Sequence, residues 1–209
     1  MKRAFIIGIC GKKRSGKNTA ADALISAFRS ECECAEMSFA EPIKRCASEL
    51  FGFSREQLDG DEKEVPDPRW EGLTPRRIVQ FFGTEMMQFK IQEILPGVGR
   101  HFWCHRLIKR IHDLPQDTLV VVTDLRFKHE QEALKTTFGD RFICLKVERY
   151  HDDHHHQGGG DCHLSEMEVQ DICADVIVKN NSDRESFQKE CVDVLKQKLN
   201  IYSIDRKHM

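Results

Sequence analysis

The sequence has no excess of charge of either sign and no long apolar run. Lysine and arginine together number 32 and aspartate and glutamate 34, which gives a formal net charge of −2. A protein that binds a large stretch of nucleic acid needs a basic excess on one face, so the composition argues against that class. No apolar run approaches the roughly 20 residues needed to cross a membrane. The apolar stretch after Met1-Lys2-Arg3 is also too short for a signal peptide, which favours a cytoplasmic protein.

The nine cysteines lack the paired spacing of a zinc site or of a disulfide framework. Cys32 and Cys34, for example, form C-x-C and not C-x-x-C. An odd number of scattered cysteines predicts reduced thiols in a reducing compartment. Cys10 and Cys144 lie within apolar runs, so we expect them to be small residues of the core.

The most informative segment of the sequence is a glycine-rich loop that directly follows the apolar run at 4–10. Residues 11–19 read Gly-Lys-Lys-Arg-Ser-Gly-Lys-Asn-Thr, which places Lys17 at the lysine of the G-x-x-x-x-G-K-[ST] pattern. Gly11 and Gly16 permit the turns that let successive backbone N–H groups wrap a phosphate at a helix N-terminus. Asn18 stands where the pattern has a hydroxyl for Mg²⁺, and Thr19 follows it. The loop therefore predicts that the chain binds a nucleotide.

Five short apolar segments predict a parallel sheet covered on both faces. They lie at 4–9, 35–39, 118–123, 141–147 and 175–179, and helical patterns separate them. We expect helices at 17–28, at 41–51, from the N-cap Thr74 with Pro75 after it, at 129–138, and from a capping box at Ser182 and Glu185 to the last apolar residues. The fold class is therefore α/β, a three-layer P-loop fold with about five parallel strands flanked by helices.

The length favours a single domain over residues 1–209. Two segments look irregular: 59–73 is rich in charge and proline, and 150–162 contains three consecutive glycines. We interpret them as loops over a site. The acceptor-binding region is predicted at about residues 40–100 and a lid at about residues 149–165.

A phosphate loop alone leaves kinases, GTPases, motor ATPases and synthetases open. No Asn-Lys-x-Asp segment, which guanine-specific switch proteins need, follows a later strand. A small kinase must also hold a second, anionic acceptor and neutralise charge in the transition state with Arg, Lys and Mg²⁺. Such residues should cluster where strands end and loops begin.

Charged residues do follow the predicted strands. The strand at 118–123 ends in Asp124-Leu125-Arg126. Asp124 could hold Mg²⁺ or anchor a substrate hydroxyl, or it could cap the next helix. Lys44 follows the second strand, where it could bind the acceptor. Arg149 ends the fourth strand and could close over the phosphates as part of the lid.

Three further arginines, Arg69, Arg76 and Arg77, lie before or within the first turn of the helix that opens at Thr74. Exposed arginines usually do no more than solvate a helix, but three together suit the binding of a monophosphate. An acceptor that is itself a phosphate needs no general base, because its oxygen is already ionised near neutral pH. A sequence without an obvious base beside a nucleophile fits that chemistry.

These motifs belong to a longer series of blocks that runs in order over most of the chain. The series comprises residues 11–19, 39–44, 73–85, 102–103, 123–130, 163–166 and 175–181. It resembles the deoxynucleoside monophosphate kinases of phages and viruses, and the block from Leu73 to Glu85 is the most specific. The resemblance implies a P-loop kinase that uses Mg²⁺ and moves the γ-phosphate of ATP onto a (deoxy)nucleoside monophosphate, a small-molecule substrate. It leaves homodimerisation open.

The resemblance also implies a set of site residues. The ATP site comprises Gly11, Lys13, Arg14, Ser15, Gly16, Lys17, Asn18 and Thr19, with Arg149 in the lid. The acceptor site comprises Ile43, Lys44, Arg69, Arg76, Gly83, Thr84, Trp103, Asp124 and Arg126. We expect Lys17, Arg126, Arg76 and Asp124 to act in catalysis, and Asn18, Thr19 and Asp124 to be the candidate Mg²⁺ ligands. Where the family usually has Gly-Lys-Asp-Thr, this chain has Asn18.

Three other interpretations remain. Phosphomevalonate kinase of the animal type carries a similar loop and also has a phosphate acceptor. Its acceptor has no base, so it needs no aromatic residue for stacking. In this chain Phe39, Phe81, Phe82 or Trp103 could stack a base. A metal-binding module could use the segment with His151, His154, His155, His156, Cys162 and His163, although its ligands lack paired spacing. A nucleotide-dependent switch without catalysis would not need the clustered arginines.

Overall fold

The computed structural model describes residues 5–149 and 168–205 of the chain. The chain divides into two compact units. The first comprises Met1–Ser38 and Ile108–Met209, and the second comprises Phe39–Leu107. The second unit covers nearly the same residues as the predicted acceptor region. The single domain expected over 1–209, with its acceptor region and lid, stays a prediction. In the described part of the chain, no helix combines the length and the apolar character needed to span a membrane.

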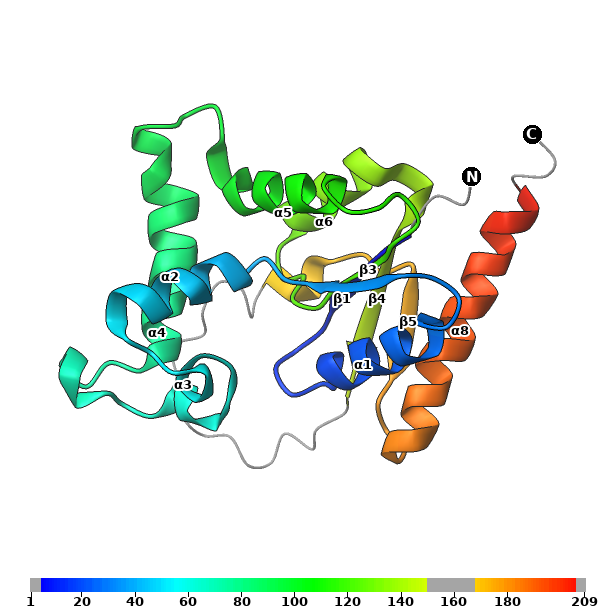
Figure 1. Cartoon of the computed structure of the whole chain (residues 1–209), viewed down its shortest axis with the longest axis horizontal. Helices are drawn as coiled ribbons and strands as arrows, with labels where there is room; N and C mark the ends of the chain where they lie inside the picture. Colours follow the sequence, from blue (N-terminus) through cyan, green and yellow to red (C-terminus); the bar gives the residue numbers. More distant parts are fainter. Residues whose placement is uncertain (1–4, 150–167, 206–209) are drawn as a thin grey trace. The chain divides into compact units, whose positions relative to one another are not determined.

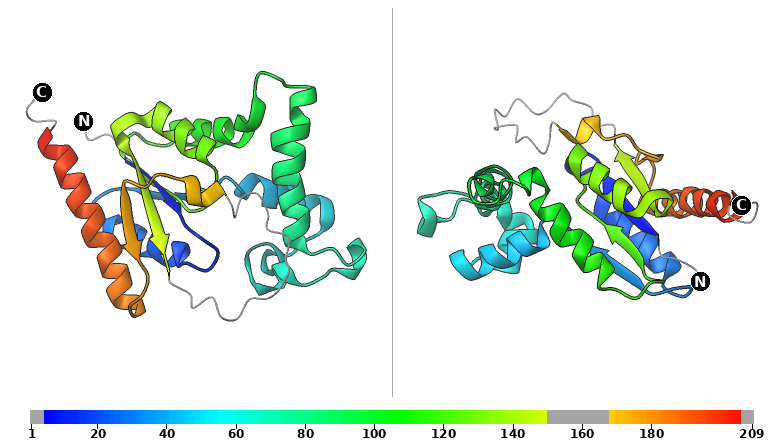
Figure 2. Two further views of the ribbon diagram at one scale, coloured as in Figure 1. Left: turned by 180° about the vertical axis from the view of Figure 1, so that it is seen from behind. Right: turned by 90° about the horizontal axis from the view of Figure 1, so that it is seen from above.

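The first unit is built on a five-stranded sheet in which every pairing is parallel. Its strands are β1 (Ile6–Cys10), β2 (Cys34–Met37), β3 (Leu119–Val122), β4 (Phe142–Glu148) and β5 (Val176–Lys179), in the order β2-β3-β1-β4-β5. The strands β1 and β3 are buried throughout, whereas the edge strand β5 alternates buried and exposed residues. Figure 2 shows β4 and β5 running side by side. All five strands predicted from the sequence are confirmed.

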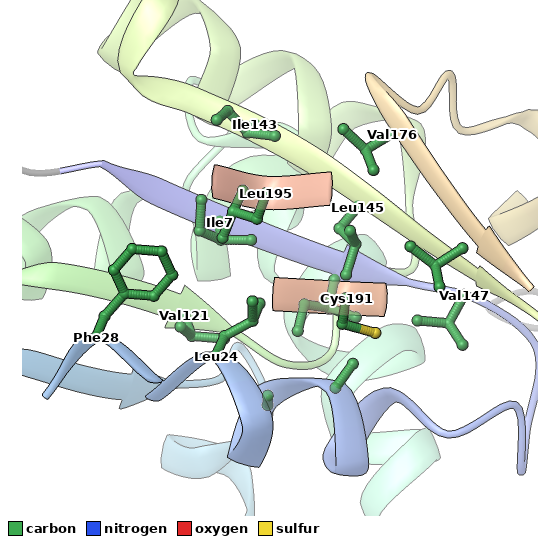
Figure 3. Close-up of a cluster of buried hydrophobic side chains, with 14 of the residues drawn as sticks. Ile7, Leu24, Phe28, Val121, Ile143, Leu145, Val147, Val176, Cys191 and Leu195 are labelled. Atoms are coloured by element: carbon green, nitrogen blue, oxygen red, sulfur yellow. The ribbon is translucent and has the colours of Figure 1, made fainter. Parts of the chain in front are cut away.

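Helices cover both faces of this sheet. On one face α1 (Lys17–Phe28) and α8 (Arg184–Asp205) bury Leu24, Cys191 and Leu195 against side chains of the strands (Figures 1 and 3). On the other face α6 (Lys128–Phe138) buries Leu134 and Phe138. The short turns η6 (Gly139–Arg141) and η8 (Glu168–Asp171) also belong to this unit. Cys10 and Cys144 are both fully buried, as predicted.

The helix ends follow the local sequence, with one correction. The helices α1 and α2 (Glu41–Phe51) have the predicted bounds, and α6 ends before Gly139, as its sequence predicts. The capping box predicted at Ser182 and Glu185 is wrong. The residue before α8 is Asp183, whose carboxylate accepts from the backbone N–H of Ser186 at 3.0 Å and from its hydroxyl at 2.7 Å. These bonds lower the pKa of Asp183.

The second unit consists of short helices. They are α2, α3 (Arg55–Asp59), η1 (Asp61–Glu64), η2 (Pro68–Trp70), α4 (Pro75–Gln80), the π-helical segment η3 (Phe81–Phe89), η4 (Lys90–Glu93), η5 (Gly99–His101) and the beginning of α5 (Phe102–His112). Ala47, Phe53 and Ile78 form its apolar cluster, and Phe51 and Phe82 pack against it. The hydroxyl of Thr74 accepts from the N–H of Arg77 at 3.2 Å, so the predicted cap of α4 is confirmed. The sequence did not predict α3 or α5.

Candidate active site

The glycine-rich loop between β1 and α1 has the backbone shape that its sequence predicts. Gly11 and Gly16 both have positive φ, at 144° and 106°. A Cβ on Gly11 would lie 2.3 Å from the carbonyl oxygen of Val147, and one on Gly16 would lie 2.4 Å from the amide nitrogen of Asn180. Both positions therefore require glycine for conformation and for space. Arg14, at the loop tip, is also left-handed, with φ 61°.

Two polar side chains of this loop bear on anion binding. The ammonium of Lys17 donates to the carbonyl oxygens of Gly11 at 2.8 Å and Lys12 at 2.7 Å, which holds its charge over the loop. The hydroxyl of Ser15 is buried inside the loop, and no described group makes a hydrogen bond with it. A buried hydroxyl without a partner is costly, and a phosphate oxygen within the loop would satisfy it. The loop therefore fits the phosphates of a nucleotide.

The turn after β3 lies directly beside the start of the loop. The backbone N–H of Leu125 donates to the carbonyl oxygen of Ile9 at 3.2 Å, so Asp124 and Arg126 flank a residue that is bound to β1. Both Asp124 and Arg126 are half-buried. Parallel strands end at one edge of the sheet, and here that edge places the backbone of residues 124–126 next to the start of the phosphate-binding loop, so the roles of Asp124 and Arg126 stay predictions.

The buried carboxyl group of Glu130 binds the backbone of this turn. One of its oxygens accepts from the backbone N–H of Arg126 at 2.9 Å and from that of Phe127 at 3.1 Å. Burial raises the pKa of Glu130 to about 8, and the charge of Asp124 adds to the rise. The sequence alone suggests no role for Glu130 in the site. Its position three residues into α6 is typical of a capping box, which was the available signal.

Asn180, which follows β5, is a second residue that sequence reasoning missed. Its side-chain amide donates to the carbonyl oxygen of Ser15 at 2.8 Å, and its backbone N–H donates to that of Glu148 at 2.7 Å. Asn180 thereby ties the end of β5 to the phosphate loop. Its only sequence signal was its place at the end of a strand, within the block at 175–181.

In the second unit, three predicted acceptor residues lie together. The indole N–H of Trp103 donates to the carbonyl oxygen of Gly83 at 2.8 Å. A Cβ on Gly83 would lie 2.9 Å from the terminal methyl group of Ile43. The adjacent Thr84 is buried. Trp103 and Phe39 are also buried, so of the aromatic residues considered for base stacking Phe81, with 45% of its surface exposed, is the most accessible.

The three predicted acceptor cations of this unit each lie beside a carboxylate from residues 59–67. Lys44 pairs with Asp59 at 2.5 Å and Arg76 with Glu64 at 3.4 Å. Arg69 pairs with Asp67 at 2.6 Å, and the guanidinium holds the pKa of Asp67 well below its usual range. The side chain of Arg76 is 19% exposed, against 53% for Arg69. An acceptor phosphate would therefore compete with these carboxylates for the cations.

The other predicted residues differ in how far they are exposed. Lys13, Arg14 and Asn18 are exposed, Thr19 is half-buried, and Arg149 is exposed directly after β4. The lid beyond Arg149 and the histidine-rich segment at 151–163 lie outside the described residues. Within the part that is described, no three His, Cys, Asp or Glu side chains gather as a metal site.

The chain matches known kinases in sequence and in fold. The family model for deoxynucleotide monophosphate kinase matches residues 62–191. A protein of Acanthamoeba polyphaga mimivirus, named "Putative deoxynucleotide monophosphate kinase", is 34% identical over 197 residues, which span 90% of this chain and 96% of that protein. Thymidylate kinase from Candida albicans has a similar fold, with a TM-score of 0.51 and 14% identity over 95% of this chain and 93% of its own. The three-layer P-loop fold predicted from the sequence is confirmed, and the chain belongs to the deoxynucleotide monophosphate kinase family.

Proposed function

We propose that this chain transfers the γ-phosphoryl group of ATP to a deoxynucleoside monophosphate and releases ADP and the deoxynucleoside diphosphate. The observation that carries the proposal is the phosphate loop with Lys17 beside the Asp124–Arg126 turn, in a chain of this family. Among residues 5–149 and 168–205, no feature favours phosphomevalonate as the acceptor.

On the ATP side, the backbone N–H groups of the loop would hold the β- and γ-phosphates, with Lys17 as their counter-charge. Arg126 would neutralise the charge that develops on the transferred group. The proposed ligands of Mg²⁺ are the side chains of Thr19 and Asp124 and the side-chain amide oxygen of Asn18. That ion prefers oxygen ligands and keeps several waters, so few protein ligands suffice.

On the acceptor side, Arg76 would bind the monophosphate in place of Glu64, and Lys44 would do so in place of Asp59. Ile43, Gly83 and Trp103 would form the wall of the nucleoside pocket. Because the acceptor phosphate carries its own ionised oxygen, attack on the γ-phosphorus needs no base from the protein. The protein contributes position and charge.

Several finer statements belong to the same proposal. A cytoplasmic location fits the eight described cysteines, all of which are free, because reducing compartments keep thiols reduced. Arg149 is proposed to belong to a lid over the phosphates. Homodimerisation stays open, and the absence of nucleic-acid binding stays a prediction from the sequence.

The test is ADP release from ATP and Mg²⁺ with dGMP, dTMP, dCMP, dAMP, the ribonucleotides and phosphomevalonate as separate acceptors. Turnover with at least one deoxynucleoside monophosphate is expected, and it should fall by two or more orders of magnitude in Lys17→Ala, which lacks the counter-charge. Turnover confined to phosphomevalonate, or no turnover with any acceptor while ATP still binds, would overturn the proposal.

A further inference from the structure

The buried carboxyl group of Glu130 makes more contacts than a helix cap requires. Only 3% of Glu130 is exposed, and one of its oxygens accepts two backbone N–H groups, from Arg126 and from Phe127. A capping box at the start of α6 accounts for the bond to Phe127, the N-cap residue. It does not account for the shorter bond, at 2.9 Å, to the residue before the cap.

That second bond fixes the backbone from which Arg126 projects. The N–H of Leu125 is bound to Ile9 of β1, and the next two N–H groups are bound to Glu130. Three successive peptide groups are thereby held between a buried strand and a buried side chain. The direction in which the Arg126 side chain leaves the backbone is set by these peptide groups.

We infer that Glu130 is a positioning residue for phosphoryl transfer, because it holds the Arg126 backbone at the orientation from which the guanidinium reaches the reacting phosphates. This inference rests on the role proposed above for Arg126. A misplacement of about 1 Å in a positioned group can cost about 100-fold in rate, so the loss of a backbone anchor directly beneath such a group should be visible in turnover.

The chemistry of the two bonds suggests a matched pair of variants. Both bonds need an acceptor oxygen and no negative charge, and burial raises the pKa of Glu130 to about 8, so the neutral acid predominates at pH 7. Glu130→Gln keeps an acceptor oxygen at the same place. Glu130→Met fills a similar apolar volume but removes the acceptor.

The experiment compares kcat, KM and Tm for the wild-type chain, Glu130→Gln, Glu130→Met, Arg126→Ala and the double variant Arg126→Ala with Glu130→Met. We expect Glu130→Gln to keep kcat within about three-fold and Glu130→Met to lose about 10- to 100-fold in kcat, with little change in KM for ATP. In the Arg126→Ala background, Glu130→Met should change kcat by less than about three-fold, because the group that it positions is gone. If Glu130→Met does not fold, Glu130→Asp replaces it, since its shorter side chain cannot reach both N–H groups.

Asp183→Ala is the control for a purely structural cap, because Asp183 caps α8 through Ser186. It should lower Tm and leave kcat unchanged. A Glu130→Met chain that behaves in the same way would overturn the inference, as would an equal loss of kcat with and without Arg126. Wild-type kcat in Arg126→Ala would remove the proposed role of Arg126 and the inference with it. If the wild-type chain shows no turnover, the proposed function is overturned instead. The wild-type assay comes first, so this failure is distinguished from a failure of the inference about Glu130.

Discussion

At the residue scale, the phosphate loop was predictable because its signal is local, whereas the residues that support it were not. Gly11, Gly16 and Lys17 lie within seven consecutive residues of the sequence. Asn180 contacts the same loop from 165 residues further along the chain, through one hydrogen bond to a carbonyl group. Nothing in the sequence around Asn180 indicates that partner, since any polar residue after a strand can serve as an ordinary turn residue.

Removal of the Asn180 amide should weaken ATP binding. In Asn180→Ala the Ser15 carbonyl loses its donor and the loop loses its tie to β5. We expect KM for ATP to rise about ten-fold, which corresponds to about 1.4 kcal/mol, with KM for the acceptor unchanged. Steady-state kinetics with each substrate varied in turn measures this. Asn180→Asp, which has the same size but no N–H to donate, should be at least as impaired, and a normal Asn180→Asp would contradict the role of the amide.

Arg76 and its neighbour Arg77 offer a matched comparison for the acceptor site. Arg76 is 19% exposed beside Glu64, whereas Arg77 is 48% exposed beside Glu85. We expect Arg76→Ala to raise KM for the deoxynucleoside monophosphate by about ten-fold or more, because a charge-assisted bond to phosphate is lost. Arg77→Ala should change it by less than about two-fold. If Arg76→Ala changed KM for ATP but not KM for the acceptor, the assignment of Arg76 to the acceptor site would be contradicted.

Glu130 should also make stability depend on pH. Its pKa is about 8 in the folded chain, against an ordinary value of 4.5. Between pH 4.5 and pH 8 the carboxyl group of Glu130 holds a proton in the folded chain that it has released in the unfolded chain. The contribution of Glu130 to the free energy of unfolding is therefore fully present below pH 4.5 and is lost as the pH rises through 8. The free energy of unfolding should fall by up to about 1.4 kcal/mol per pH unit in this window. Urea unfolding at pH 5, 6, 7 and 8 should show a steeper decline in the wild-type chain than in Glu130→Gln, and equal slopes would rule this out.

At the element scale, segments with both a periodic pattern and clear start and stop signals were predictable, and elements without such signals were not. The five strands follow from short apolar runs, and α1 and α2 from clear start and stop signals. The helix α5 was missed because no Ser, Thr, Asp or Asn precedes it to mark a start. The cap of α8 was placed one residue too early because Ser182 and Asp183 can both cap, and only the contacts with Ser186 decide between them.

The π-helical segment η3 had no sequence signal, and we expect it to depend on space at Gly83. The Cβ of Gly83→Ala would meet the terminal methyl group of Ile43 at 2.9 Å. We expect Gly83→Ala to raise KM for the acceptor, because Ile43 must shift to admit the new Cβ, and to lower the free energy of unfolding by only about 1 kcal/mol or less, because the end of the Ile43 side chain can rotate. Ile43→Val removes that methyl group, so the double variant should recover part of both losses. Urea unfolding and acceptor kinetics measure the two effects, and a double variant as impaired as the sum of the single ones would show that the contact is not the cause.

At the scale of the whole molecule, the sequence predicted the class of the sheet but not its strand order. Near-continuous apolar runs separated by helices indicate parallel strands. The order β2-β3-β1-β4-β5 depends on which side each crossover takes, and no residue pattern in the strands specifies that choice. The second unit, Phe39–Leu107, likewise emerges only from contacts in three dimensions, although its residues nearly coincide with the predicted acceptor region.

The two units should differ in their resistance to unfolding, and buried cysteines can report on each. The apolar cluster of the second unit has Ala47, Phe53 and Ile78 as its buried members, whereas the cluster of the first extends over β1, β3, β4, β5, α1 and α8. A smaller core is expected to open at a lower free energy. Cys104 of the second unit and Cys191 of the first are both buried, and burial raises the pKa of the Cys191 thiol to about 12, so neither should react in the folded chain.

We therefore expect alkylation in increasing urea, followed by peptide mass spectrometry, to label Cys104 at a lower urea concentration than Cys191. Cys46 and Cys173 are exposed and should be labelled without urea, which provides the internal control. Saturating ATP should raise the midpoint for Cys191 by mass action, because the phosphate loop belongs to the first unit, and shift Cys104 less. Coincident midpoints for Cys104 and Cys191, with and without ATP, would show instead that the chain unfolds as one cooperative body.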